Sequence, residues 1–204
     1  MKNAVDKIPL GISDDEVALG SHIVHFWRTE EEFEHGVRFL ELGMANESEY
    51  CVLFGHDEAN DRVLQILEKK GYDLDRLRRE RRLVVLRREA SASETLTNIE
   101  MAFSTAVRKG AKAIRYLGNL GTGQAPLPGR GADELVELET GATALALRYP
   151  CVIVCMYDVN TLSGHFLLTA GFGTHPLAVW QDALRQNPYY PEKEAPGHRN
   201  AAHA

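Results

Sequence analysis

The chain has 204 residues, of which 44% are hydrophobic and 25% charged, so it is long and apolar enough for one globular domain with a sizeable core. Its formal net charge of −6 argues against a generally basic nucleic-acid-binding protein. Three cysteines, an odd number, exclude a disulfide scaffold and predict reduced thiols in a cytoplasmic protein. The longest strongly apolar run, residues 151–157, falls far short of the roughly 20 residues that a membrane helix needs.

Strand and helix patterns alternate along the chain. Five short apolar segments predict strands: 22–27, 50–54, 83–86, 113–117 and 151–157. Caps, helical spacing and terminating glycines predict helices over about 30–45, 57–70, 91–109 and 133–148, with a last helix between Ser163 and Gly171. This repetition is typical of an α/β fold in which a mainly parallel central sheet is covered by helices on both faces, a three-layer sandwich.

Composition divides the chain into three parts. Residues 1–19 are polar and predict a loose N-terminal arm, residues 20–186 form the α/β domain, and residues 187–204, rich in Pro, His and Ala, predict a flexible C-terminal tail.

Ligands of open α/β sheets bind at the carboxyl ends of the strands, and the loop Gly118–Gly131 leaves one such end. Its glycines could cradle phosphate, but the loop lacks both the Lys-Ser/Thr pair of a P-loop and the G-x-G-x-x-G spacing of a dinucleotide site. A mobile loop, or a lid over a small ligand, is the favoured interpretation, and a nucleotide-binding switch is the alternative.

Metal binding and nucleophilic catalysis are less favoured. His22 and His25 point to opposite faces of one strand, and Cys151 and Cys155 are separated by about 13 Å along another. A metal site would need Cys155 and His175 to meet a carboxylate such as Asp158, and a cysteine hydrolase would pair Cys155 with His175 or His22. A cysteine within an apolar strand is usually protonated and inert, so we expect no metal, no cofactor and no catalysis.

The basic segment 76–88 contains seven arginines and could contact an acidic protein or nucleic acid. Interleaved glutamates and the lack of alternating aromatic residues favour a solvated or protein-contacting face over direct nucleic-acid binding.

A set of polar and aromatic residues at or near strand ends suits a small-molecule pocket. It contains His22, Trp27, Arg115, Glu139, Tyr157, Asp158 and His175. An ion pair between Arg115 and Glu139 that joins a strand to a helix is the structural alternative.

Several segments together resemble the MEDS domain, a methanogen and methylotroph sensory domain. They are Gly20-Ser21-His22-Ile23 with Phe26-Trp27, Phe39-Leu40-x-x-Gly43, Arg115 to Gly118, Glu139, Cys155-x-Tyr157-Asp158 and His175-Pro176. The sequence departs from the family pattern at Val24, Trp27, Asn119 and Thr122, where the family commonly has cysteine, tyrosine, an acidic residue and tryptophan.

The resemblance implies a RecA-like fold with a degenerate phosphate loop, and a function in prokaryotic signal transduction as a sensor of small molecules, among them simple hydrocarbon derivatives. We therefore expect a non-enzymatic, cytoplasmic sensory domain that acts on a separate signalling protein, with no membrane partner, and base rates favour a homodimer. The expected ligand-binding residues are His22, Trp27, Arg115, Gly118, Asn119, Glu139, Cys155, Tyr157, Asp158 and His175. A RecA-like nucleotide switch and a metal- or cysteine-dependent hydrolase remain the alternatives.

Overall fold

A mainly parallel sheet forms the centre of the computed structural model, which describes residues 6–120 and 132–191. Its strands are β3 (His22–Trp27), β4 (Glu49–Gly55), β5 (Leu83–Arg87), β6 (Ala113–Asn119), β7 (Cys151–Asp158), β8 (Leu177–Trp180) and β9 (Ala183–Gln186). Within these residues the sheet has seven strands in the order β5-β4-β6-β7-β3-β8-β9, and only β8 and β9 pair antiparallel.

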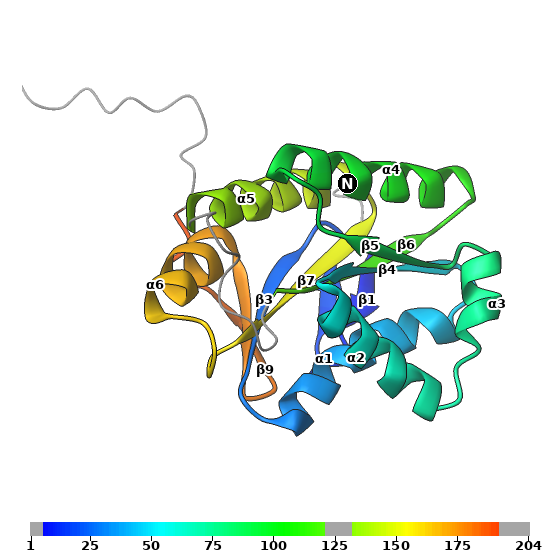
Figure 1. The fold of residues 1–204 in the computed structure, drawn as a ribbon, viewed down its shortest axis with the longest axis horizontal. Coiled ribbons are helices and arrows are strands. Elements are labelled where there is room, and N and C mark those ends of the chain that lie inside the picture. Colours follow the sequence, from blue (N-terminus) through cyan, green and yellow to red (C-terminus); the bar gives the residue numbers. More distant parts are fainter. Residues whose placement is uncertain (1–5, 121–131, 192–204) are drawn as a thin grey trace, which may run out of the picture.

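Helices cover both faces of the sheet (Figure 1). The helical segments are α1 (Glu30–Ala45), α2 (Asp57–Lys69), α3 (Leu74–Arg79), α4 (Ala92–Arg108), α5 (Ala132–Arg148), α6 (Gly164–Phe166) and the π-helix η1 (Leu167–Phe172). Side chains of α1, α2 and α3 pack on one face, while those of α4, α5 and η1 pack on the other. The predicted α/β three-layer sandwich is therefore observed, with every predicted strand and helix in place to within a few residues.

Strand alternation decides which side chains reach each layer. In β3, Ile23 and Trp27 belong to the core under α1 and α2, whereas Val24 and Phe26 belong to the core under α4 and α5. In β7, Cys155 and Tyr157 likewise face α5. The register places His22 beside Ile153 and Trp27 beside Asp158, so that β7 runs beside β3 along the whole length of β3.

The N-terminal segment differs from the prediction of a loose arm. Residues 7–9 (β1, Lys7–Pro9) and 16–18 (β2, Glu16–Ala18) form an antiparallel hairpin. Leu10 is fully buried, and Ile8, Ile12 and Val17 join the core under α1. These alternating apolar residues anchor the hairpin to the domain.

The C-terminal segment is also anchored further along the chain than expected. The buried side chain of Asn187 donates hydrogen bonds to the backbone oxygens of Phe172 (2.7 Å) and His175 (2.6 Å). Residue 187 therefore belongs to the domain rather than to a tail, and residues 192–204 lie outside the described part of the chain. So do residues 121–131, which contain most of the predicted lid.

No helix in the described segments is both long and apolar enough to cross a membrane.

Candidate functional site

Five of the ten predicted ligand-binding residues meet in one buried cluster between the sheet and α5. They are His22 from β3, Cys155 and Tyr157 from β7, Glu139 from α5, and His175, which directly precedes Pro176 and β8. None of these side chains is exposed by more than a few per cent. We call this group the His/Glu/Cys cluster.

The carboxylate of Glu139 lies at the centre of the cluster. Its Oε1 accepts a hydrogen bond of 2.7 Å from the hydroxyl of Tyr157. Its Oε2 accepts one of 3.3 Å from the thiol of Cys155. The Nε2 atoms of His22 and His175 lie 3.3 and 3.5 Å from the same Oε2.

The outer nitrogen of each histidine ring is held by a further partner. His22 Nδ1 lies 2.8 Å from the hydroxyl of Thr143, and that hydroxyl donates to the backbone oxygen of Glu139 at 3.1 Å. His175 Nδ1 donates to the backbone oxygen of Gly171 at 2.8 Å. A carbonyl can only accept, so the ring of His175 carries its proton on Nδ1. The Nε2 lone pair of His175 therefore points into the cluster.

Burial sets the protonation states of the cluster. It lowers the pKa of His22 and of His175 to about 3, which leaves both imidazoles neutral near pH 7. Burial, reinforced by the charge of Glu139, raises the pKa of the Cys155 thiol and of the Tyr157 phenol well above their usual values. The contacts of Glu139 with the two histidines are therefore not ion pairs, and Cys155 is not an activated nucleophile in this arrangement.

Of the other five predicted residues, Gly118 adjoins the cluster and four lie away from it. Arg115 faces α1. Its guanidinium donates hydrogen bonds to the carboxylate of Glu49 (2.5 Å) and to the backbone oxygen of Pro9 (2.8 Å). The alternative ion pair between Arg115 and Glu139 is thus wrong, because the two side chains point to opposite faces of the sheet.

Trp27, Asn119 and Asp158 mark the carboxyl edge of the sheet. Trp27 packs edge-to-face on Phe33, with ring centroids 5.0 Å apart, on the α1 face. The amide of Asn119 donates to the backbone oxygen of Ala59, and Asp158 accepts from the backbone amide of Asn160. Gly118 stands opposite Cys155 in the sheet register, where a side-chain Cβ would lie 3.5 Å from its sulfur.

An apolar pocket of about 640 Å³ lies at the carboxyl ends of β3, β7 and β8, beside η1. The residues that line it are Phe26, Val159, Gly164, Leu167, Leu168, Phe172, Ala178, Trp180, Arg185, Gln186, Asn187 and Pro188. None of the ten predicted residues is among them. The alternation of side chains along β3 could have indicated which residue lines the pocket, because Trp27 faces α1 whereas its neighbour Phe26 faces the pocket.

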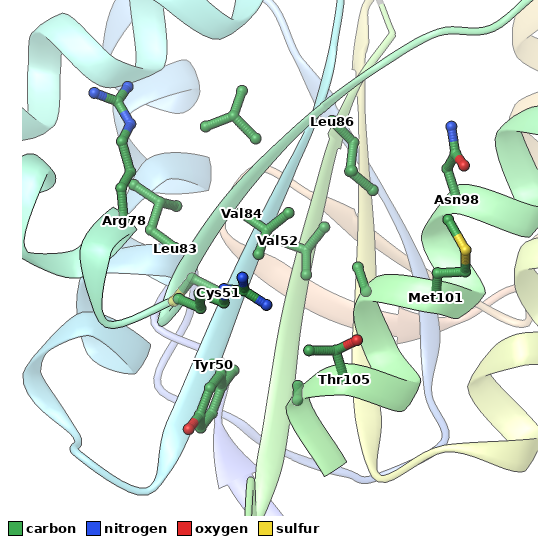
Figure 2. Close-up of a pocket in the computed structure, with 14 residues that line it drawn as sticks. Tyr50, Cys51, Val52, Arg78, Leu83, Val84, Leu86, Asn98, Met101 and Thr105 are labelled. Carbon is green, nitrogen blue, oxygen red and sulfur yellow. The ribbon is translucent and has the colours of Figure 1, made fainter. Parts of the chain in front are cut away.

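A second hollow, of about 570 Å³, lies between the edge strand β5 and α4 (Figure 2). Aliphatic side chains of β4 and β5 form its floor, and Met101, Asn98 and Thr105 reach it from α4. It adjoins none of the cluster residues, which makes it a useful control site for binding experiments.

The N-termini of α1 and α2 are poorly suited to phosphate. α1 begins with Glu30, Glu31 and Glu32, and the carboxylate of Glu32 already accepts from the backbone amides of Arg28 (2.7 Å) and Thr29 (3.2 Å). α2 begins with Asp57 and Glu58. A phosphate group at either end would meet like charge.

Comparison with protein families identifies the chain. The model of one family, described as "MEDS: MEthanogen/methylotroph, DcmR Sensory domain", matches residues 21–176. The chain belongs to the MEDS family. This confirms the resemblance found in the sequence and gives the domain a sensing role in signalling. No curated protein matches the sequence.

A solved structure supports the fold assignment of this MEDS domain. The crystal structure of a KaiC-like protein from the hyperthermophilic archaeon Pyrococcus horikoshii OT3 is similar, with a TM-score of 0.61 and 13% sequence identity. The match covers 86% of this chain and 80% of that one. At this level of identity the likeness concerns the fold, and it confirms the predicted RecA-like class.

Proposed function

We propose that this MEDS domain is a non-enzymatic sensor of a small apolar molecule, which binds in the pocket beside η1. One observation carries the proposal: the pocket and the His/Glu/Cys cluster share a wall. Phe26 and Phe172 line the pocket with ring centroids 4.7 Å apart, and Gly171 lies directly behind Phe26. The backbone oxygen of the same Gly171 accepts the hydrogen bond from His175.

Close packing makes this wall sensitive to what fills the pocket. A Cβ at Gly171 would lie 3.0 Å from two atoms of the Phe26 ring, so the ring and the backbone of η1 are already in contact. A ligand that displaces Phe26 or Phe172 must therefore move the backbone that orients His175. The pocket in this way communicates with the buried cluster through a single residue.

The π-helix is a suitable switching element. Single turns of π-helix are rare and occur frequently at functional sites. A ligand shifts the equilibrium between two arrangements of η1 only by the difference between its binding free energies for the two. The response therefore depends on direct contact of the ligand with this segment. Leu167, Leu168 and Phe172 of η1 provide that contact.

The apolar lining also favours this function over the alternatives. Catalysis would need an activated group in the pocket, whereas its walls are mostly aliphatic and aromatic and the thiol of Cys155 is protonated. A nucleotide switch would need a phosphate site, and acidic residues occupy the starts of α1 and α2.

Calorimetric titration with a series of short haloalkanes tests the proposal. We expect saturable binding to the wild-type domain and at least about tenfold weaker binding to Ala178→Leu, which narrows the pocket, because tenfold corresponds to about 1.4 kcal/mol. Ala102→Leu narrows the second hollow and is the matched control that should bind like the wild type. Absence of saturable binding, or equal loss in both variants, would refute the proposed site.

Thermal unfolding with Mg²⁺ and ATP or GTP separates the nucleotide alternative. A nucleotide at a hundred times its dissociation constant would stabilise the domain by about 2.7 kcal/mol. We expect no such stabilisation, and a clear increase in melting temperature would favour the nucleotide switch instead.

A further inference from the structure

We propose that His22, Glu139, Cys155 and His175 bind a divalent transition-metal ion, with Zn²⁺ as the best match. The four residues offer two imidazole nitrogens, one carboxylate oxygen and one sulfur, all within 4.8 Å of one another. This set of nitrogen, oxygen and sulfur donors is typical of four-coordinate zinc. The proposal is independent of what the apolar pocket binds.

The spacing of the donor atoms fits one ion. Bonds of about 2.0–2.3 Å in a tetrahedron place neighbouring ligand atoms roughly 3.3–3.8 Å apart. Glu139 Oε2 lies 3.3 Å from His22 Nε2, 3.3 Å from Cys155 Sγ and 3.5 Å from His175 Nε2. His22 Nε2 lies 3.4 Å from Cys155 Sγ. Four of the six separations between ligand atoms thus already have the required length.

The direction of the lone pairs points to a cation rather than to a hydrogen-bond network. His175 carries its proton on the outer Nδ1, so its Nε2 presents a lone pair to the Glu139 Oε2 atom, which also presents lone pairs. Among the described residues, Nε2 of His175 is buried without a hydrogen-bond partner. A metal ion bound between these two atoms would satisfy both lone pairs at once.

Charge balance supports a divalent ion. In the described part of the chain no lysine or arginine pairs with Glu139, and the two histidines beside it are neutral. A divalent cation bound to one carboxylate, one thiolate and two neutral imidazoles has no net charge, which suits a site without solvent. Binding would release the proton of Cys155 to solvent, because only the thiolate coordinates.

The surrounding residues form the outer shell that such a site requires. Thr143 and the backbone of Gly171 fix the two ring orientations, and the Tyr157 hydroxyl holds Oε1 so that Oε2 faces the centre. Outer partners of this kind orient metal ligands and increase their affinity. With four protein ligands and no solvent access, the site resembles closed structural zinc sites rather than catalytic ones.

Metal analysis of the full chain tests the proposal directly. After exposure to Zn²⁺ and removal of the excess, we expect about one equivalent of zinc per chain. With Co²⁺ in place of zinc, we expect the visible bands of a tetrahedral ion together with a thiolate-to-metal band. Retention of well under one equivalent by the folded wild type, or a cobalt adduct without the thiolate band, would overturn the proposal.

Matched variants locate the ion. Cys155→Ser and His22→Gln should weaken zinc binding by at least about 100-fold, and Tyr157→Phe by about 10–100-fold. Cys151→Ser and His25→Gln replace buried residues of the same types outside the cluster and should retain full binding. Equal losses in the two series would place the ion elsewhere and refute the assignment.

A second variant tests the role of Cys155 even if Cys155→Ser does not fold. The double substitution Cys51→Ser/Cys151→Ser leaves Cys155 as the only cysteine of the chain, which has three. We expect this protein to keep the thiolate-to-metal band of the cobalt form. Loss of the band from the folded double variant would exclude Cys155 as the ligand.

Discussion

Residues of one type take different roles in this domain according to the face of the strand that they occupy. His22 and His25 lie on β3 three positions apart, and strand alternation sends the first into the His/Glu/Cys cluster and the second toward α1. His25 donates from Nε2 to the backbone oxygen of Glu32 at 2.9 Å. Its environment therefore makes it a buried, neutral packing residue.

The acid sensitivity of folding should depend in part on His25. Burial lowers the pKa of His25 below its usual 6.5, so the unfolded chain binds a proton that the folded chain excludes. The free energy of unfolding should therefore decrease as pH falls below 6.5, by up to about 1.4 kcal/mol per pH unit for this group. Denaturant unfolding at about pH 7.5 and about pH 5 measures the effect.

The variant His25→Gln keeps a donor for the Glu32 oxygen but cannot titrate. We expect its loss of stability between these two pH values to be smaller than that of the wild type. The exposed His165 provides the control variant His165→Gln, in which the wild-type acid dependence should be retained. An identical profile in His25→Gln would contradict this explanation.

The buried pair of Arg115 and Glu49 provides a second prediction at the residue scale. Both side chains are almost fully buried, and Arg115 also donates to Pro9 of the hairpin. Arg115→Leu leaves a buried carboxylate without its partner and should lower the free energy of unfolding by about 3–5 kcal/mol. The double variant with Glu49→Leu should recover much of this loss, and additive losses in denaturant unfolding would argue against a direct pair.

Sequence reasoning found the residues of the cluster but not its geometry. It considered Cys155 and His175 with Asp158, yet Asp158 is three positions from Cys155 and therefore lies on the other face of β7. The carboxylate that completes the cluster, Glu139, comes from α5. Thr143, one helical turn further along, could have been found by its spacing, whereas the contact of Gly171 with His175 depends on how η1 packs.

At the scale of elements, long periodic segments were predictable and short ones were not. Each strand of the hairpin has three residues, too few for an alternating pattern to stand out among polar neighbours. η1 was expected as part of an ordinary helix, because apolar spacing does not distinguish π-helical from α-helical hydrogen bonding. The hairpin packs on the core and η1 lines the pocket, so the first matters for stability and the second for the proposed function.

The hairpin should contribute directly to stability. Leu10 follows β1 and is 0% exposed in the core under α1, so Leu10→Ala should lower the free energy of unfolding by about 2–5 kcal/mol. Leu147 is 77% exposed on α5, and Leu147→Ala should change stability by less than about 0.5 kcal/mol. Equal effects of the two variants in denaturant unfolding would mean that the N-terminal segment is loose after all.

At the scale of the whole molecule, the proposed metal ion would connect β3, β7, α5 and the start of β8. Zinc at a thousand times its dissociation constant stabilises a folded protein by about 4.1 kcal/mol. For a domain of this size, chelation should thus lower the melting temperature by roughly 8–16 °C. Calorimetry with and without a chelator measures this, and an unchanged melting temperature in a zinc-loaded sample would contradict a stabilising ion.

Diffraction from crystals soaked in dibromomethane tests the proposed sensory function most directly. The bromine atoms scatter anomalously and reveal where a small halogenated hydrocarbon binds. We expect a bromine peak in the pocket bounded by Phe26, Phe172 and Ala178, accompanied by a shift of η1. Bromine confined to the hollow between β5 and α4, or no ordered bromine within the domain, would contradict the account.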